Sequence, residues 1–219
     1  GVNTTDGGVI TDTIADTVAL TEEELEIDND QPVTSVNAAG VTVLNQKVPV
    51  FFQVGEYTFA LGDPLQPQRL YRSKVQRPEN WPAVDYQDVC GASEELLNGG
   101  AFASAGFVFS RTRMYSIDIN GLDGSWSTDP TTCSEGLIGR WAHCVTPYGI
   151  AFVSLYGVRI TTGNGFESLS DGWIDPLFRG QIARGLDPIA VNSPTTIFLE
   201  YHANELWLTY LNTCGDYRQ

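Results

Sequence analysis

The sequence predicts an all-β fold of β-propeller-like blades built from short antiparallel strands, and three observations carry this prediction. Apolar and polar residues alternate with a period of two along much of the chain from Val48 onward, as in half-buried strands. Pairs of such strands recur at the spacing of propeller blades. The composition is that of a turn-rich β protein, because aromatic residues make up 11%, charged residues only 18%, and there are 22 glycines.

The alternation assigns individual strands. Tyr115, Ile117 and Ile119 fall on one face of their strand, and Ser116 and Asp118 fall on the other. The segment Gly149–Val153 is apolar on both faces, which is typical of a strand in the middle of a core. The expected strands are Val48–Val54, Tyr57–Leu61, Gly106–Ser110, Met114–Ile119, Gly149–Val153, Val158–Thr161 and Glu205–Tyr210.

Two segments repeat the order strand, short turn, strand and Asn-Gly, one from Gly106 to Gly121 and one from Gly149 to Gly165. Their starting glycines are 43 residues apart, which is close to the length of a four-stranded blade. The final strand is followed by a turn and by Tyr217-Arg218-Gln219, which begins a return strand. A hairpin without its second arm leaves an unpaired edge. We therefore expect this chain to be part of a larger propeller.

One short helix is expected within the β pattern. Ile174, Leu177 and Phe178 fall at helical spacing, Ser170 is a candidate cap, and Pro176 limits the length.

Residues 1–46 differ from residues 47–219, which carry the blade pattern. They hold nine acidic residues and no Lys or Arg. Such one-sided charge with few apolar residues predicts an acidic arm or an inserted segment rather than a blade. Thr21 could cap one helical turn, and Asp28-Asn29-Asp30 is a weak Ca²⁺ candidate without the rest of an EF-hand loop.

The net charge of −15 argues against affinity for nucleic acid, since an acidic surface repels phosphates. No apolar run reaches the roughly 20 residues of a membrane span. The four cysteines, Cys90, Cys133, Cys144 and Cys214, form no CxxC pair, so a zinc site is not expected. We interpret the cysteines as small buried hydrophobic residues. A disulfide bridge between Cys133 and Cys144 is the open alternative.

The sequence predicts no enzyme, because it contains none of the common catalytic motifs. We expect His143 and His202 to be structural, since neither has a second ligand at metal spacing. The segment from Ser116 to Trp126 partly resembles the Asp-box of sialidase propellers, but there the Asp, here Asp118, stabilises a turn. A sialidase-like glycoside hydrolase is therefore a minor alternative. No catalytic, cofactor-binding or metal-binding residue is assigned, and no cofactor is expected.

A receptor- or glycan-binding propeller is the main alternative. Its candidates for stacking on sugars are the five tryptophans, although we expect each to pack between blades. They are Trp81, Trp126, Trp141, Trp173 and Trp207.

Three stretches in order resemble the irregular β-propeller of tailed-bacteriophage tail proteins. They are Arg69–Pro82, then Met114–Asp118 with Gly121–Trp126, and then Val145–Val158 with its Gly-rich turn and Leu169-Ser170-Asp171. The family includes the tail nozzle (tail tubular protein B) and the packaged-DNA stabilisation proteins, and the resemblance covers roughly residues 48–219. It implies a structural virion protein without catalytic residues. Such a protein would form a homo-oligomeric ring with other tail, portal or adaptor subunits and line the DNA exit channel.

The densest basic stretch contains Arg69, Arg72, Lys74 and Arg77, between Pro67 and Pro78. We expect it to be an exposed connection that contacts an acidic neighbouring subunit. Acidic residues are expected to line the DNA path, because a channel through which DNA passes must not bind the DNA.

Overall fold

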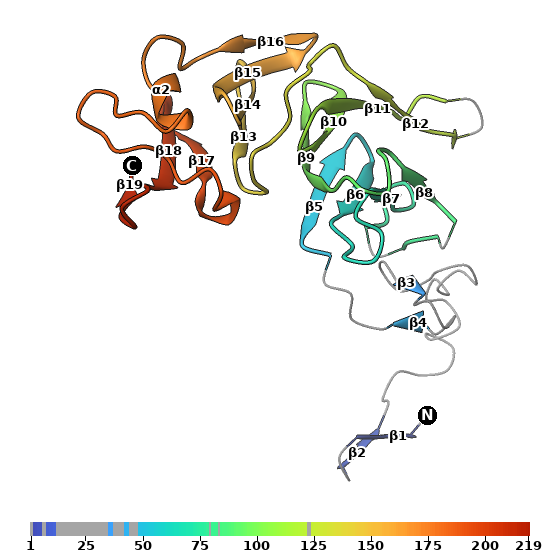
Figure 1. Ribbon diagram of the computed structural model, residues 1–219. Helices are drawn as coiled ribbons and strands as arrows, with labels where there is room; N and C mark the ends of the chain where they lie inside the picture. The colour runs from blue at the N-terminus through green and yellow to red at the C-terminus, as the bar shows by residue number, and fades with distance from the viewer. Residues whose placement is uncertain are drawn as a thin grey trace.

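A computed structural model describes residues 48–219, except Glu79, Ala83, Leu122 and Asp123 (Figure 1). Before residue 48 it describes only the backbone of four short strands. β1 (Val2–Thr5) pairs with β2 (Gly8–Thr11), and β3 (Ser35–Val36) pairs with β4 (Thr42–Val43). The expected capped turn at Thr21 and the Asp28–Asp30 loop lie outside the described residues.

The protein is all-β, and residues 50–218 form four antiparallel sheets in chain order. Sheet 1 contains β5 (Val50–Val54), β6 (Tyr57–Leu61), β7 (Arg69–Arg72) and β8 (Tyr86–Asp88). Sheet 2 contains β9 (Leu96–Phe102), β10 (Ala105–Ser110), β11 (Met114–Asp118) and β12 (Ser127–Pro130). Sheet 3 contains β13 (His143–Thr146), β14 (Gly149–Ser154), β15 (Gly157–Gly163) and β16 (Gly165–Ser168). Sheet 4 contains β17 (Phe198–His202), β18 (Glu205–Leu211) and β19 (Tyr217–Arg218).

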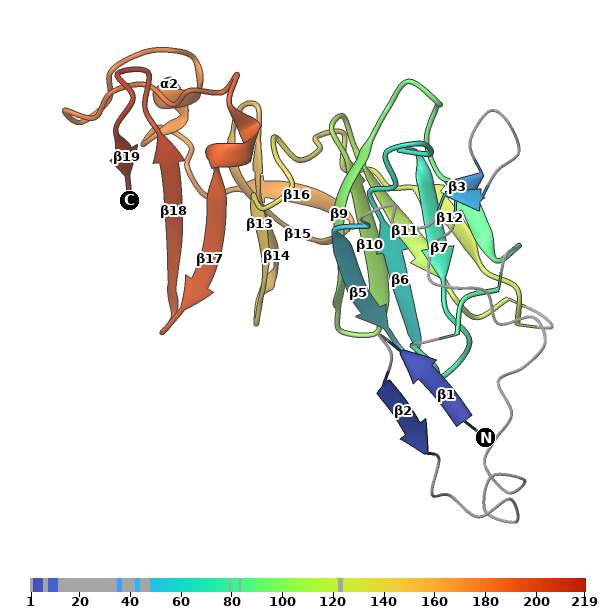
Figure 2. The same ribbon diagram turned by 90° about the horizontal axis from the view of Figure 1, so that it is seen from below.

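Every sheet is a simple meander in which neighbours in sequence are neighbours in space. The first strand of each sheet lies next to the first strand of the following sheet, so β5, β9, β13 and β17 form a row. We call these four the inner strands. The sheets follow one another along an arc, with sheets 1 and 2 on one side and sheets 3 and 4 on the other (Figures 1 and 2). No ring is closed, so the propeller architecture stays a prediction.

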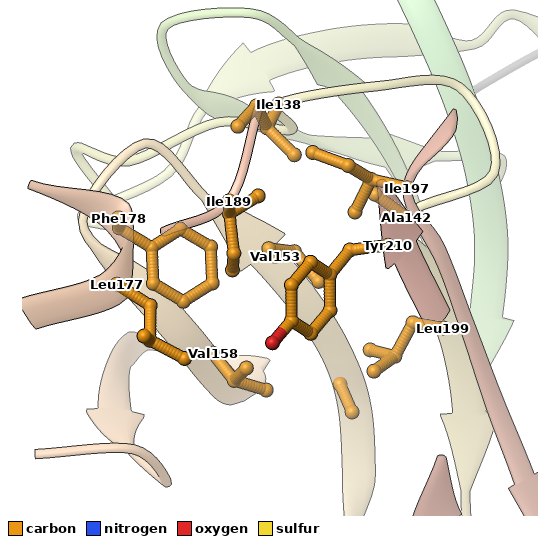
Figure 3. Close-up of a cluster of buried hydrophobic side chains, with 11 residues drawn as sticks. Ile138, Ala142, Val153, Val158, Leu177, Phe178, Ile189, Ile197, Leu199 and Tyr210 are labelled. Atoms are coloured by element: carbon orange, nitrogen blue, oxygen red, sulfur yellow. The ribbon is translucent and has the colours of Figure 1, made fainter. Parts of the chain in front are cut away.

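Each sheet buries a face against the next. Sheets 1 and 2 enclose a cluster that includes Phe59, Leu61, Val108 and Trp126. Phe109, Met114 and Phe152 belong to a second cluster between sheets 2 and 3. A third cluster joins sheets 3 and 4 to the loop between them through Val153, Leu177, Ile189, Leu199 and Tyr210 (Figure 3). The core is therefore a series of layers between sheets.

The observed strands follow the expected alternation. Tyr115 and Ile117 are buried on one face with Ile119 packed beside them, and all six residues of β14 are buried. Glycine allows close approach where sheet 1 meets sheet 2: a Cβ on Gly99 would lie 2.5 Å from the Phe52 ring, and one on Gly106 would lie 2.6 Å from Val54. The return strand expected at Tyr217 is present as β19, paired with β18.

The expected short helix is present as α2 (Asp175–Phe178), with Pro176 in its first turn. The prediction that Ser170 caps it is wrong. The Ser170 hydroxyl instead accepts a hydrogen bond from the Val158 amide (2.8 Å) and donates to the Asp175 carboxylate. Ser170 therefore ties the start of α2 to β15. A 3₁₀ turn, η2 (Pro194–Thr196), precedes β17.

All four cysteines are free, so the open possibility of a Cys133–Cys144 bridge is not realised. Cys133 is buried, Cys90 and Cys144 are half-buried, and Cys214 is exposed, so the interpretation as buried hydrophobes fails at Cys214. The described part of the chain has no helix with the length and apolar character needed to span a membrane.

Candidate interaction site

The prediction that Arg69 to Arg77 is one exposed connection is wrong for its first half. Arg69–Arg72 is strand β7 inside sheet 1, between β6 and β8. Leu70 and Arg72 are buried on one face of β7, and Arg69 and Tyr71 are half-buried on the other. An arginine on the buried face and the two flanking prolines hid this strand in the sequence.

Arg72 is 9% exposed and holds sheet 1 to sheet 2. Its guanidinium forms an ion pair with Asp85 (2.9 Å) and donates to the Gly124 carbonyl (2.9 Å). The Trp126 indole N–H donates to the other Asp85 oxygen (2.6 Å), and the Arg72 guanidinium lies 4.6 Å from the Tyr57 ring centroid. We call Arg72, Asp85 and Trp126 the polar clamp. Its groups are already paired within the chain, so Arg72 is not available as a subunit contact.

Arg69 lies on the outer side of the same strand. It pairs with Asp88 (2.8 Å) and stacks over Tyr86, 3.6 Å from the ring centroid. This guanidinium lowers the pKa of the half-exposed Asp88 carboxyl by hydrogen bonding. Lys74 and Arg77 flank a tight turn and are half-buried, and both take part in interactions within the chain. Subunit contact through Arg69, Lys74 and Arg77 stays a prediction.

The four inner strands line a common cavity of about 600 Å³. Phe51 from β5, Asn98 and Gly99 from β9, His143 from β13 and Glu200 from β17 contribute to its wall. Phe51 (54% exposed), Trp141 (47%) and Phe198 (41%) make this wall largely apolar and aromatic. Among the described residues that line it, Glu200 is the single acidic one. The expectation that acidic residues line a DNA path stays a prediction.

Side-chain and backbone hydrogen bonds join the neighbouring segments that line this cavity. The Asn98 amide donates to the Arg140 carbonyl (2.7 Å), and His143 Nε2 contacts the Gly99 carbonyl oxygen (3.2 Å). Arg140 in turn pairs with Glu95 (2.8 Å). On the other side, the Leu199 amide donates to the Trp141 carbonyl (3.1 Å). The cavity wall is therefore a continuous bonded surface from β9 to β17.

His143 is buried at the junction of sheets 2 and 3. Burial lowers its pKa to about 4, so the imidazole is neutral at pH 7 and donates to Gly99 through Nε2. Its Nδ1 is buried without a hydrogen-bond partner. His202 is exposed at the end of β17.

The tryptophans divide into two groups. Trp81 and Trp126 are buried in the protein, as expected of residues that pack between strands. Trp141, Trp173 and Trp207 are about half exposed, and they lie on three separate segments.

Asp118 forms the turn that the partial Asp-box predicts. Its exposed carboxylate accepts hydrogen bonds from the Asn120 amide (2.9 Å) and side chain (3.3 Å). Among the described residues, no group of three or more His, Cys, Asp or Glu side chains is placed to hold a metal ion.

Comparison with known proteins gives no match, either to a family model or to a curated protein sequence.

Proposed function

We propose that this chain is a structural protein of a bacteriophage tail, a nozzle or head-to-tail connector component whose four sheets are blades of a propeller. In this proposal it assembles as a homo-oligomeric ring with other tail, portal or adaptor subunits in the virion. Its acidic surface faces the exit path of the DNA.

The observation that carries the proposal is the row of inner strands. Each sheet begins with its inner strand, successive inner strands are neighbours, and all four line one cavity. This is the arrangement that radially stacked blades have around an axis. The three stretches that resemble phage tail proteins fall on β7 and the turn after it, on β11 with its following turn, and on β13–β15.

The charge supports a conduit rather than a DNA-binding protein. The net charge of −15 repels phosphates, and Arg69, Arg72, Arg140 and Arg159 are each paired to a carboxylate within the chain. The proposal includes no catalytic step, and Asp118 serves as a turn residue.

The test is the location of the protein. Mass spectrometry of purified virus particles should detect this chain in a fixed ratio to the portal protein, and particles lacking it should fail to eject DNA. Finding the protein only in the soluble fraction of infected cells would overturn the proposal. Fluorescence anisotropy with duplex DNA at physiological salt should show no binding, and tight binding would contradict the conduit role.

The remaining basic contacts can be tested separately. The double variant Lys74→Glu and Arg77→Glu should weaken ring assembly in sedimentation experiments, while the protein stays folded. The control is Arg113→Glu, a charge reversal at the exposed turn between β10 and β11. Equal assembly of both variants would exclude this turn as a subunit contact.

A further inference from the structure

A second hollow lies between sheets 3 and 4, away from the inner cavity. It is a groove of about 680 Å³, within the usual range of ligand sites. Three turns at the same end of the two sheets surround it: the turn between β13 and β14, the turn between β15 and β16, and the turn between β17 and β18. The apolar cluster of Figure 3 closes the interface farther in, so the groove is the open end of this interface.

One wall of the groove presents aromatic and apolar surface. Tyr148 is 71% exposed, Leu169 is 47% exposed and Phe166 is 36% exposed, and all three line the groove. Tyr148 and Leu169 leave apolar surface in contact with water, whereas the Phe166 ring lies under the Arg159 guanidinium, 5.7 Å from the ring centroid.

Polar groups without partners stand beside these rings. Within the described residues, the side chains of Asn164 and Glu167 make no hydrogen bond or ion pair, although both line the groove. The Asn204 side chain accepts a hydrogen bond from the Tyr201 hydroxyl (2.9 Å), which fixes its amide and leaves the NH₂ group available. The groove therefore offers two amides and one carboxylate, which can both donate and accept.

The backbone holds these groups in place. The Thr161 hydroxyl accepts from the Gly163 amide (3.0 Å) and donates to the Gly165 carbonyl (2.5 Å), which fixes the irregular turn that carries Asn164. Ala203 and Asn204 both have positive φ angles, 51° and 66°, as the tight turn between β17 and β18 requires. Asn164 and Asn204 are thus on tight turns, and Glu167 lies on strand β16.

We propose that this groove binds an uncharged oligosaccharide. The C–H faces of sugar rings pack on aromatic rings, and sugar hydroxyls both donate and accept, as amides and carboxylates do. Among the described residues that line the groove, Glu167 is the single charged one. The Arg159 guanidinium over Phe166 is itself paired to Glu135, so an anionic ligand is disfavoured. The surface differs from the tryptophan platforms that the sequence suggested, because its rings are Tyr148 and Phe166.

The proposal is tested by saturation-transfer NMR on the intact protein with three uncharged probes: chitotriose, maltotriose and cellotriose. We expect transfer to at least one, with a dissociation constant on the order of 0.1–1 mM. Tyr148→Ala should weaken that binding about tenfold, and Asn164→Ala should weaken it about threefold. Tyr156→Ala is the matched control, because Tyr156 is 56% exposed in the turn at the opposite end of sheet 3. It should bind like the unaltered protein.

Three outcomes would overturn the proposal. The first is no transfer to any probe at roughly 10 mM, well above the expected dissociation constant. The second is an equal loss of binding in the Tyr148→Ala and Tyr156→Ala variants, which would place the sugar elsewhere. The third is equal transfer to an uncharged tripeptide, which would make the groove an unselective apolar cleft.

Discussion

Sheets 1 and 2 are joined differently from sheets 3 and 4, although both pairs are consecutive meanders with a buried layer between them. In the first pair, the polar clamp of Arg72, Asp85 and Trp126 connects β7 and the start of β8 to the segment before β12. Gln87 adds a second link, since its side chain bonds to Trp126 and Thr128. In the second pair, no side-chain hydrogen bond among the described residues connects β15 or β16 to sheet 4, and the groove opens there.

The difference shows how one architecture yields both a closed and an open interface. Apolar clusters hold both pairs together near their centres. Away from the centre, a network of satisfied hydrogen bonds closes the first interface, whereas exposed rings and the side chains of Asn164 and Asn204 border the second. The first interface is therefore closed by polar contacts, and the second leaves exposed surface between its sheets.

The largest expected effect comes from breaking the polar clamp. Arg72→Met keeps the bulk of the side chain but leaves the Asp85 carboxylate, 20% exposed, without its cation. We expect the free energy of unfolding to fall by about 3 kcal/mol, the low end for a partly buried pair. Urea denaturation measures this loss.

Arg69→Met is the matched control on the same strand. Its partner Asp88 is 46% exposed, so water replaces the lost partner, and we expect a loss below about 1 kcal/mol. Equal losses in both variants would show that the clamp is no more important than a surface pair.

The next effect concerns the junction between the two halves of the molecule, where His143 meets Gly99. The pKa of His143 is about 4 in the folded protein and about 6.5 in the unfolded chain. The unfolded chain therefore binds more protons between these two pH values. His143 therefore costs no stability above pH 6.5 and destabilises progressively as the pH falls through this window. Between pH 7 and pH 4.5 we expect it to lower the free energy of unfolding by about 2 kcal/mol.

His143→Gln separates this contribution from that of the carboxylates. The amide can still donate to the Gly99 carbonyl but does not titrate. The variant should lose about 2 kcal/mol less than the unaltered protein over the same pH interval. An identical pH dependence in the two proteins would mean that the imidazole is already solvated in the folded state.

A smaller effect is expected inside the apolar cluster of sheets 3 and 4. The Tyr210 hydroxyl is buried there without a hydrogen-bond partner (Figure 3). Tyr210→Phe removes this unsatisfied group and keeps the ring, so we expect a gain of about 1 kcal/mol in the free energy of unfolding. A loss of stability would show that the hydroxyl has a partner in solution, such as a bound water.

The alternating segments made the central hairpins predictable from sequence, whereas the expected strands did not include β7, β8, β9, β12, β13, β16 and β17. The hairpins β5–β6, β10–β11 and β14–β15 were all expected, because their period-2 pattern is uninterrupted. β9 was missed, since Asn98-Gly99-Gly100 interrupts its apolar run, and these small residues are needed where β5 approaches. β8 was missed because it has three residues.

The sites were less predictable than the strands. The acidic partner of Arg72 is 13 residues away and Gly124 is 52 residues away, so the clamp depends on contacts that no local pattern reveals. The same holds for the groove, whose walls come from two sheets. The Gly-rich turn before Phe166 was visible in the sequence, but the exposure of Tyr148 and Phe166 depends on tertiary packing that no local pattern reveals.

The smallest expected effect is also the most direct test of the open interface. If Tyr148 helped to hold sheets 3 and 4 together, its removal would destabilise the protein as loss of a core ring does, by about 3–5 kcal/mol. Its side chain is 71% exposed, and its backbone turn is held by the Thr146 hydroxyl, which accepts from the Tyr148 amide (3.1 Å) whatever the side chain. Tyr148→Ala should therefore change the free energy of unfolding by less than about 0.5 kcal/mol, as should Tyr156→Ala at the opposite turn. Thermal and urea unfolding of both variants measure the change, and a loss above about 2 kcal/mol for Tyr148→Ala alone would make the ring part of the interface rather than free for a ligand.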